Sequence, residues 1–143
     1  MPERAEGGST LLLVPSAVLI LFLLTALAVD GAAAFLAQRE LADACAGAAN
    51  DAAAVALDPE RLYGASGPSA QQVDLGRAGD IAHSRVAPLE ARWGRPVDVQ
   101  AETVGPQVVM HLGASVPLPI GPGGASRPRT KVNATCEATT VRR

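Results

Sequence analysis

Residues Leu11–Val29 have the sequence LLLVPSAVLILFLLTALAV, and this stretch decides how the rest of the chain is organised. No charged residue interrupts it, and its only polar side chains are those of Ser16 and Thr25. A helix needs about 20 apolar residues to cross the hydrocarbon layer of a bilayer, so the stretch is long enough to span a membrane. We consider three interpretations of this single run: a membrane anchor, a cleaved signal peptide or a buried core helix.

The three interpretations differ in what must surround the run. A buried helix needs apolar partners on all sides, and the rest of the chain has few large apolar residues to supply them. A signal peptide fits Arg4 upstream and the Ala26-Leu27-Ala28 pattern, which matches an A-x-A cleavage site. A retained anchor fits the length of the run and the helical pattern that continues past Ala28. We expect the anchor, with release after Ala28 as the alternative.

The remaining composition indicates one small domain. The chain has 143 residues and a formal net charge of -2, and it has no basic face of the kind that binds nucleic acid. Aromatic residues make up 3% of the chain, whereas small residues dominate, so we expect a thin core. The aromatic residues that stack on bases or sugars are also missing. We therefore expect neither a nucleic acid nor a small-molecule substrate as a partner.

An Ala-rich segment, residues 31–57, continues the helical pattern beyond the run. Small or apolar residues recur there at spacings of three and four, with good helix formers between them. We therefore expect one helix from about Ser9 to Leu57, ended by Asp58-Pro59. Its expected buried stripe consists of Leu41, Cys45, Ala48, Ala52 and Val55.

A second helix is expected from Ser69 to Ala87, after a Gly/Ser/Pro-rich loop over residues 60–68. Pro88 is expected to limit it, because proline lacks the amide hydrogen that continues a helix. The residues expected on its apolar face are Leu75, Ala78, Ala82, Val86 and Leu89.

From Val97 onward the apolar period changes to two, which predicts strands with one buried face each. A turn at Gly105-Pro106 makes the first two strands a hairpin, and a Pro/Gly-rich loop over residues 117–128 precedes a last strand, Thr130–Val141. The residues expected to face inward are Val97, Val99, Ala101, Val108, Met110, Leu112, Ala114, Val116, Val132, Ala134, Cys136 and Ala138. The predicted fold class is thus α+β, with a long N-terminal helix packed on a small antiparallel sheet of about three strands.

The two cysteines, Cys45 and Cys136, both follow the apolar run. Two unpaired, buried thiols are one interpretation, since free cysteine behaves as a small hydrophobic residue. However, Cys136 lies on the apolar face of the last strand, and Cys45 lies on the small-residue stripe of the long helix. If the sheet packs on that helix, both sulfurs face the same interface. We therefore predict a Cys45–Cys136 disulfide, which would persist in an exported domain.

Residues suited to catalysis are scarce. His83 and His111 are the two histidines, and neither belongs to a nucleophile elbow, a metal-ligand spacing or a phosphate loop. The cysteines are far apart and form no C-x-x-C motif. An exported hydrolase would need a nucleophile–base pair to which we cannot point. We therefore predict no enzyme, no catalytic or metal-ligating residue and no cofactor.

The order of features at the N-terminus resembles that of the bacterial TadE/TadG-like proteins of the tight-adherence (Flp) pilus system. A short polar leader is followed by a Gly-Ser-type junction, Gly8-Ser9-Thr10, and by the apolar run. An acidic residue, Asp30, comes next, and an Ala-rich amphipathic helix follows it. In that helix residues 35–41 read FLAQREL and residues 50–54 read NDAAA. The resemblance covers roughly residues 7–57.

The resemblance implies a pseudopilin-like minor component of a pilus-assembly or secretion system, without enzymatic activity. Such a subunit is held in the cytoplasmic membrane of a bacterium by its apolar helix, with the C-terminal domain outside that membrane. Its implied partners are the membrane and other pilus-assembly or pseudopilin subunits. Some family members are trimmed by a prepilin peptidase, which would here cut after Gly8 or after Gly7. Pilin-type precursors carry a glutamate a few residues after the cut, whereas Leu13 and other apolar residues stand there in this chain.

The sequence thus predicts four segments with distinct roles. They are a short polar leader (1–10), a transmembrane helix (11–29), a helix extension (30–57) and a small extracytoplasmic α+β domain (58–143). The expected function is that of a membrane-anchored TadE/TadG-like accessory subunit that acts by helix packing. The alternative is a small secreted binding domain, released by signal peptidase after Ala28.

Overall fold

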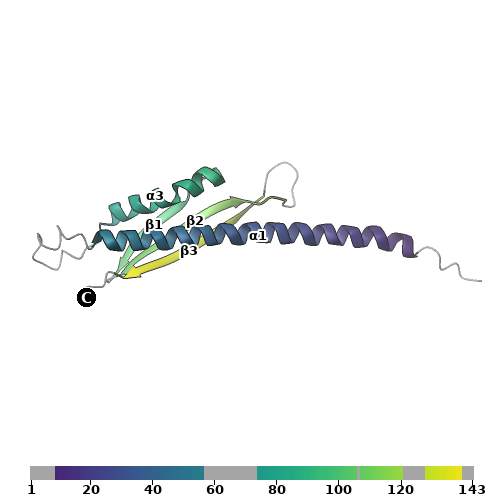
Figure 1. Ribbon diagram of the computed structural model, residues 1–143, viewed down its shortest axis with the longest axis horizontal. Helices are drawn as coiled ribbons and strands as arrows, with labels where there is room; N and C mark the ends of the chain where they lie inside the picture. The colour runs from purple at the N-terminus through teal and green to yellow at the C-terminus, as the bar shows by residue number, and fades with distance from the viewer. Residues whose placement is uncertain (1–8, 57–73, 106, 121–127, 140–143) are drawn as a thin grey trace, which may run out of the picture.

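One helix, α1 (Ser9–Ala56), sets the length of the molecule. The computed structural model describes residues 9–56, 74–105, 107–120 and 128–139 (Figure 1). With 48 residues, α1 is about 72 Å long at the α-helical rise of 1.5 Å per residue. The prediction of one continuous helix from Ser9 is confirmed as far as Ala56, whereas the expected stop at Asp58-Pro59 lies outside the described residues. Pro15 lies near the start of α1, where it removes one backbone hydrogen bond and the helix continues past it.

Three strands form an antiparallel sheet in the order β1-β2-β3, so the predicted α+β class is confirmed. Their bounds are Asp98–Val104 for β1, Gln107–Pro117 for β2 and Arg129–Thr139 for β3. The turn between β1 and β2 contains Gly105 with a φ of 61°, a left-handed conformation that glycine adopts without strain. Across the centre of the sheet, Met110 of β2 pairs with Ala101 of β1 and with Cys136 of β3.

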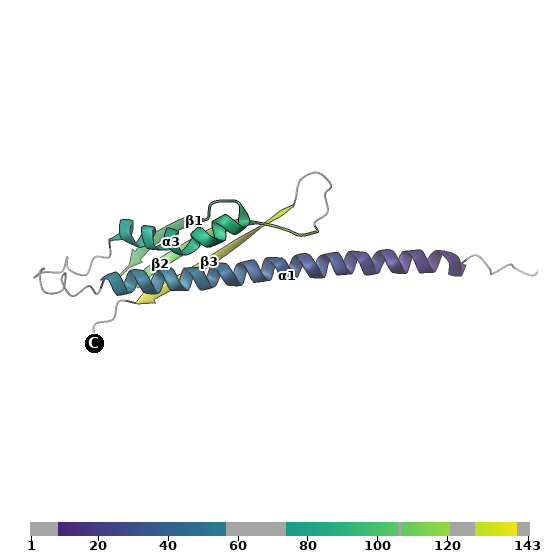
Figure 2. The same ribbon diagram turned by 45° about the horizontal axis from the view of Figure 1, so that its top comes forward.

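Both helices cover the same face of the sheet (Figures 1 and 2). The C-terminal part of α1 packs on β2 and β3, and α3 (Leu75–Trp93) packs on β1 and alongside α1. The alternation predicted from the sequence is confirmed on β2, where Val108, Met110 and Leu112 are buried under the helices. We call the part of the molecule formed by residues 37–56 of α1, α3 and the three strands the head.

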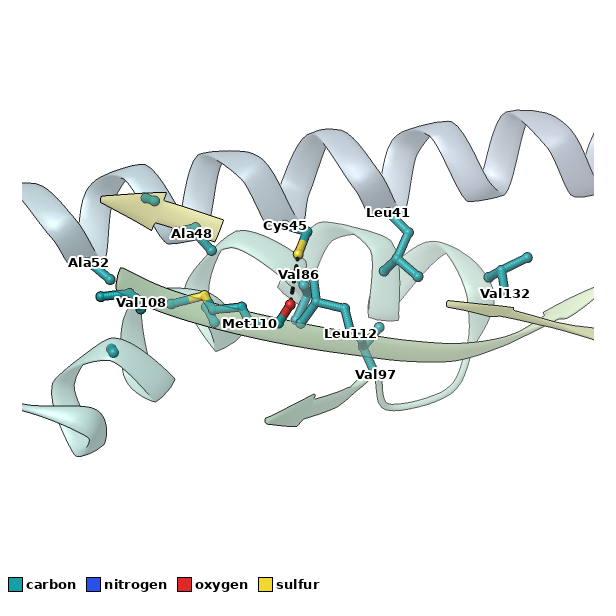
Figure 3. Close-up of a cluster of buried hydrophobic side chains, with 14 of the residues drawn as sticks. Leu41, Cys45, Ala48, Ala52, Val86, Val97, Val108, Met110, Leu112 and Val132 are labelled. Atoms are coloured by element: carbon teal, nitrogen blue, oxygen red, sulfur yellow. Dashed lines mark hydrogen bonds between the residues drawn. The ribbon is translucent and has the colours of Figure 1, made fainter. Parts of the chain in front are cut away.

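The core of the head is built from small side chains (Figure 3). Four of the five residues in the predicted stripe of α1 are buried, and the fifth, Val55, is half-buried. Among the described residues, no charged or polar side chain is buried. The largest fully buried side chains are Leu41, Met110, Leu112, Val86, Val108 and Cys45.

The predicted limits of the second helix were wrong. Asp74 has an extended backbone, and its carboxylate accepts hydrogen bonds from the amides of Gly76 and Arg77, so α3 begins at Leu75. At the other end Gly94 has a φ of 65° and donates its N–H to the carbonyl oxygen of Glu90, a left-handed cap that ends the helix after Trp93.

Pro88 lies inside α3 and does not limit it. The proline ring leaves the carbonyl of Ser84 without its helical partner, but both residues are exposed, so water can hydrate that carbonyl. The predicted apolar face is buried at Ala78, Ala82 and Val86, which follow one another at intervals of four residues. Leu75 was also expected on this face, but it is 42% exposed because it starts the helix at the end of the head.

The stability of the head should depend on the few large residues of its core. The Leu41→Ala variant removes a fully buried side chain and should lower the free energy of unfolding by about 2–5 kcal/mol. The matched control is Leu36→Ala on the same helix, because Leu36 is 56% exposed. Urea unfolding of the full chain in detergent micelles, followed by Trp93 fluorescence, measures both. Equal losses in the two variants would contradict the packing described above.

Candidate functional site

The apolar run stands apart from the head as an exposed stalk, which we define as residues 13–29 of α1 (Figure 2). No side chain in the stalk is buried, and its large residues are exposed by 40% at Val29 to 72% at Leu27. The most apolar 18-residue window of α1 has a mean hydropathy of 2.3, and none of it is buried. By length and composition α1 can therefore cross a membrane, although a signal sequence near an N-terminus meets the same criteria.

The two hydroxyl groups in the stalk are satisfied within the helix. Ser16 Oγ donates to the carbonyl oxygen of Leu13 at 3.0 Å, and Thr25 Oγ1 donates to that of Leu21 at 2.8 Å. Such bonds remove the cost of placing a hydroxyl in an apolar surrounding. The stalk therefore presents an apolar surface all around, without an unsatisfied hydroxyl.

Asp30 ends the apolar run and connects the stalk to the sheet. Its Oδ1 accepts a hydrogen bond from the backbone N–H of Ile120, 90 residues away in the sequence, at 2.9 Å. Ile120 follows β2, and the bond from the amide of Leu118 to the carbonyl oxygen of Pro128 closes the base of the same loop. The sequence placed Asp30 at the end of the run but gave no sign of this partner.

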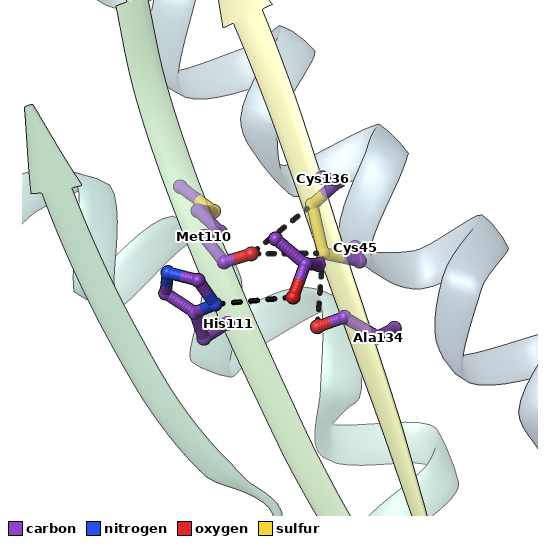
Figure 4. Close-up of a disulfide and its surroundings, with 6 residues drawn as sticks. Cys45, Met110, His111, Ala134 and Cys136 are labelled. Carbon is purple, nitrogen blue, oxygen red and sulfur yellow. Dashed lines mark hydrogen bonds between the residues drawn. A yellow bond between two sulfur atoms is a disulfide. The ribbon is translucent and has the colours of Figure 1, made fainter. Parts of the chain in front are cut away.

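A disulfide joins Cys45 of α1 to Cys136 of β3, as predicted from the sequence (Figure 4). The two Cα atoms lie 5.9 Å apart, within the usual range for a disulfide. Both sulfurs lie near the carbonyl oxygen of Met110, at 3.6 and 3.8 Å. Because a disulfide sulfur carries no hydrogen, we interpret these distances as packing contacts. The bridge thus ties the helix to the edge strand at the level of the central Met110 row.

The two histidines occupy unrelated places. His83 is exposed on α3, whereas His111 lies on the face of the sheet that the helices leave open. There its Nε2 lies 3.3 Å from Glu102 Oε1, and its Nδ1 lies 3.1 Å from Thr135 Oγ1. The side chains of His111 and Glu102 are 44% and 59% exposed, so water competes for every one of these contacts. His111 borders an open hollow of about 210 Å³ on this face, which Asn133 and Thr135 also line.

Two ion pairs between the helices were not predicted. Arg85 of α3 donates to Asp51 of α1 at 2.8 Å, and Arg92 donates to Glu40 at 2.7 Å. All four residues are at least one third exposed, so each pair contributes little to stability. No sequence pattern could have found them, because the partners are 34 and 52 residues apart.

Two further predictions concern the processing site and metal ligands. The predicted processing positions, Gly7 and Gly8, lie outside the described residues. Within the described ranges, no three or more His, Cys, Asp or Glu residues are grouped to hold a metal ion. No family model, no curated protein and no solved structure matches the chain.

Loss of the disulfide should destabilise the head strongly. A bridge between residues 91 apart restricts the unfolded chain, and its removal in Cys45→Ser should lower the free energy of unfolding by about 3–5 kcal/mol. Cys136→Ser and the double variant should lose a similar amount, because either single change already breaks the bridge. Urea unfolding in detergent micelles measures the loss. Alkylation of the unreduced wild-type chain, followed by intact-mass measurement, should add no alkyl group, and two added groups would contradict the pairing.

Proposed function

We propose that the protein is a membrane-anchored, TadE/TadG-like accessory subunit of a Flp-type pilus assembly or secretion system. In this proposal the stalk stays in the cytoplasmic membrane of a bacterium, and the head is held on the extracytoplasmic side. The observation that carries the proposal is the exposed apolar stalk, in which no side chain is buried, beside a folded head. Such a surface in water would be a strong aggregation hazard, whereas in lipid it costs nothing.

The disulfide supports the extracytoplasmic placement of the head. Disulfides persist in oxidising compartments and are rare in the cytosol. Cys45 lies 15 residues beyond Asp30, so the bridge belongs to the head and lies well outside the apolar run. With the stalk in the membrane and the head on the outer side, the apolar run is in lipid and the disulfide is in an oxidising compartment.

The proposed subunit acts by packing and without catalysis, and the surface available for packing is in the stalk. The small-residue stripe of residues 41–55 is occupied by the protein's own sheet, so it cannot serve a partner. In contrast, Thr25, Ala28 and Ala32 are exposed at spacings of three and four. Because each residue advances about 100° around a helix, these three lie roughly opposite the side that carries the head. Small residues let membrane helices approach closely, which favours association with another subunit.

The first test concerns the anchor. Membranes from cells that express the full chain are washed with carbonate, and the N-terminus of the mature protein is determined. We expect the protein to remain in the membrane pellet with an N-terminus upstream of Leu11, because the whole apolar run is retained. A soluble product that begins at Val29 would contradict the anchor and favour the secreted binding domain. An N-terminus at Met1 or Pro2 would retain the anchor but exclude trimming after Gly7 or Gly8.

The second test concerns pilus assembly. Deletion of the gene in the source bacterium should reduce the number of surface filaments, and the wild-type gene should restore them. The Ala28→Leu variant should fail to restore them, because a bulky residue on the small face prevents close approach of a partner helix. The matched control is Leu23→Ala, which lies on the opposite side of the stalk and should restore filaments. Normal filaments in the deletion strain would contradict a role in pilus assembly.

A further inference from the structure

Exposed apolar side chains lie where the stalk meets the head. Beyond the stalk, the large hydrophobic residues that are exposed among the described residues are Phe35, Leu36, Leu75, Val104 and Ile120. Phe35 and Leu36 lie on α1 just before the head begins, and Ile120 follows β2 at this same end. In contrast, Leu75 begins α3 and Val104 ends β1 at the far end of the head. Their exposed fractions are 67% for Phe35, 56% for Leu36 and 51% for Ile120.

The Asp30–Ile120 hydrogen bond sets the height of these side chains relative to the stalk. Because Asp30 ends the apolar run, it lies at the boundary of the hydrocarbon layer if the run is in lipid. The amide of Ile120 is 2.9 Å from the Asp30 carboxylate, so Ile120 lies at the same level. Phe35 and Leu36 follow Asp30 by five and six residues, which is about 8–9 Å along the helix axis. Ile120 therefore lies at the inner edge of the headgroup layer, which is about 5–8 Å thick on each side of a bilayer. Helical side chains tilt toward the N-terminus of their helix, here toward the stalk, so those of Phe35 and Leu36 reach back to the outer part of the same layer.

We propose that Leu118–Ile120 at the end of β2, together with Phe35 and Leu36, form an apolar collar that rests in the headgroup layer of the phospholipid bilayer. The occupant of this surface is lipid because the collar continues the exposed apolar surface of the stalk and is tied to its last residue. The collar explains why Asp30 is used to position a backbone amide of a distant loop. The collar fixes the orientation of the head relative to the membrane surface. Without it, a single membrane-spanning helix could tilt in the bilayer and rotate about its own axis, and the head would move with it. The inference rests on the membrane anchor of the proposed function and not on a role in pili.

The test measures contact with lipid at three positions of the full chain. Single cysteines replace Phe22 in the stalk, Ile120 in the collar and Val104 at the far end of the sheet, and each is labelled with the fluorophore NBD. The native cysteines are bonded to each other and do not react. Each protein is reconstituted in phosphatidylcholine vesicles that contain phospholipid with a spin label near the headgroup or in the middle of the acyl chain. Val104 is the matched control, because β2 separates it from the collar by about 33 Å.

We expect the headgroup-proximal spin label to cause a roughly twofold loss of NBD emission at Ile120, as for other side chains at interfacial depth. The label at Phe22 should be quenched most by the mid-chain spin label, and the label at Val104 should not be quenched. Quenching at Phe22 without quenching at Ile120 would overturn the collar and leave the anchor in place. No quenching at Phe22 would overturn the anchor and the collar together. Quenching at Val104 would also overturn the collar, because the head would then lie flat on the bilayer.

A second measurement tests the junction and avoids the introduced thiol. Tryptophan replaces the same three residues in a Trp93→Phe background, and the spin-labelled lipids quench its fluorescence. In the Ile120→Trp protein, the further change Asp30→Ala should reduce quenching at this position, because the acceptor for the loop amide is lost. Asp30→Asn retains an oxygen at the acceptor position and should preserve the quenching. If Asp30→Ala leaves the quenching unchanged, Asp30 does not position the collar and this part of the inference is overturned.

Discussion

The continuity of α1 is the constraint on which the rest of the structure depends. A single helix carries an exposed apolar surface over residues 13–29 and a buried stripe over residues 37–53. A helix transmits position along its axis, so the surroundings of the stalk determine where the head is held. The change occurs at Asp30, where the all-round apolar pattern ends and the one-sided pattern of the head begins. The remaining elements of the head are arranged on one side of the second half of this rod.

The core of the head consists largely of small side chains, so its stability depends also on a disulfide and on local hydrogen bonds. Alanine makes up much of the contact surface of α1, which brings the helix close to the sheet but buries little apolar area per residue. The Cys45–Cys136 bridge ties this helix to the edge strand of the sheet and restricts the unfolded chain. The corner between α3 and β1 is closed by Gly94 and by the Glu90 carboxylate, which accepts a hydrogen bond from the amide of Val97 at 2.7 Å. These features stabilise a domain whose core alone would be marginal.

The charged and polar side chains of the head that the structure describes lie at its surface. The polar groups of the open sheet face are exposed, and the ion pairs between α1 and α3 are exposed as well. The largest group of exposed apolar side chains begins in the stalk and continues to Ile120. The proposals for function and for the membrane-facing collar both follow from that surface.

The sequence by itself determined the long helix, the strand alternation and the α+β class, because each depends on a periodicity of neighbouring residues. The same periodicities placed Cys45 and Cys136 on facing surfaces, so even a bond between residues 91 apart could be predicted. The limits of α3 were missed although Asp74 and Gly94 are residue types that cap helices, because Pro88 was expected to stop the helix and the exposed surface of the helix tolerates it. The Asp30–Ile120 bond and the ion pairs between the helices were decided by the tertiary structure alone. Such contacts join exposed polar groups far apart in the chain, and only the packed positions of the elements bring them within hydrogen-bonding distance.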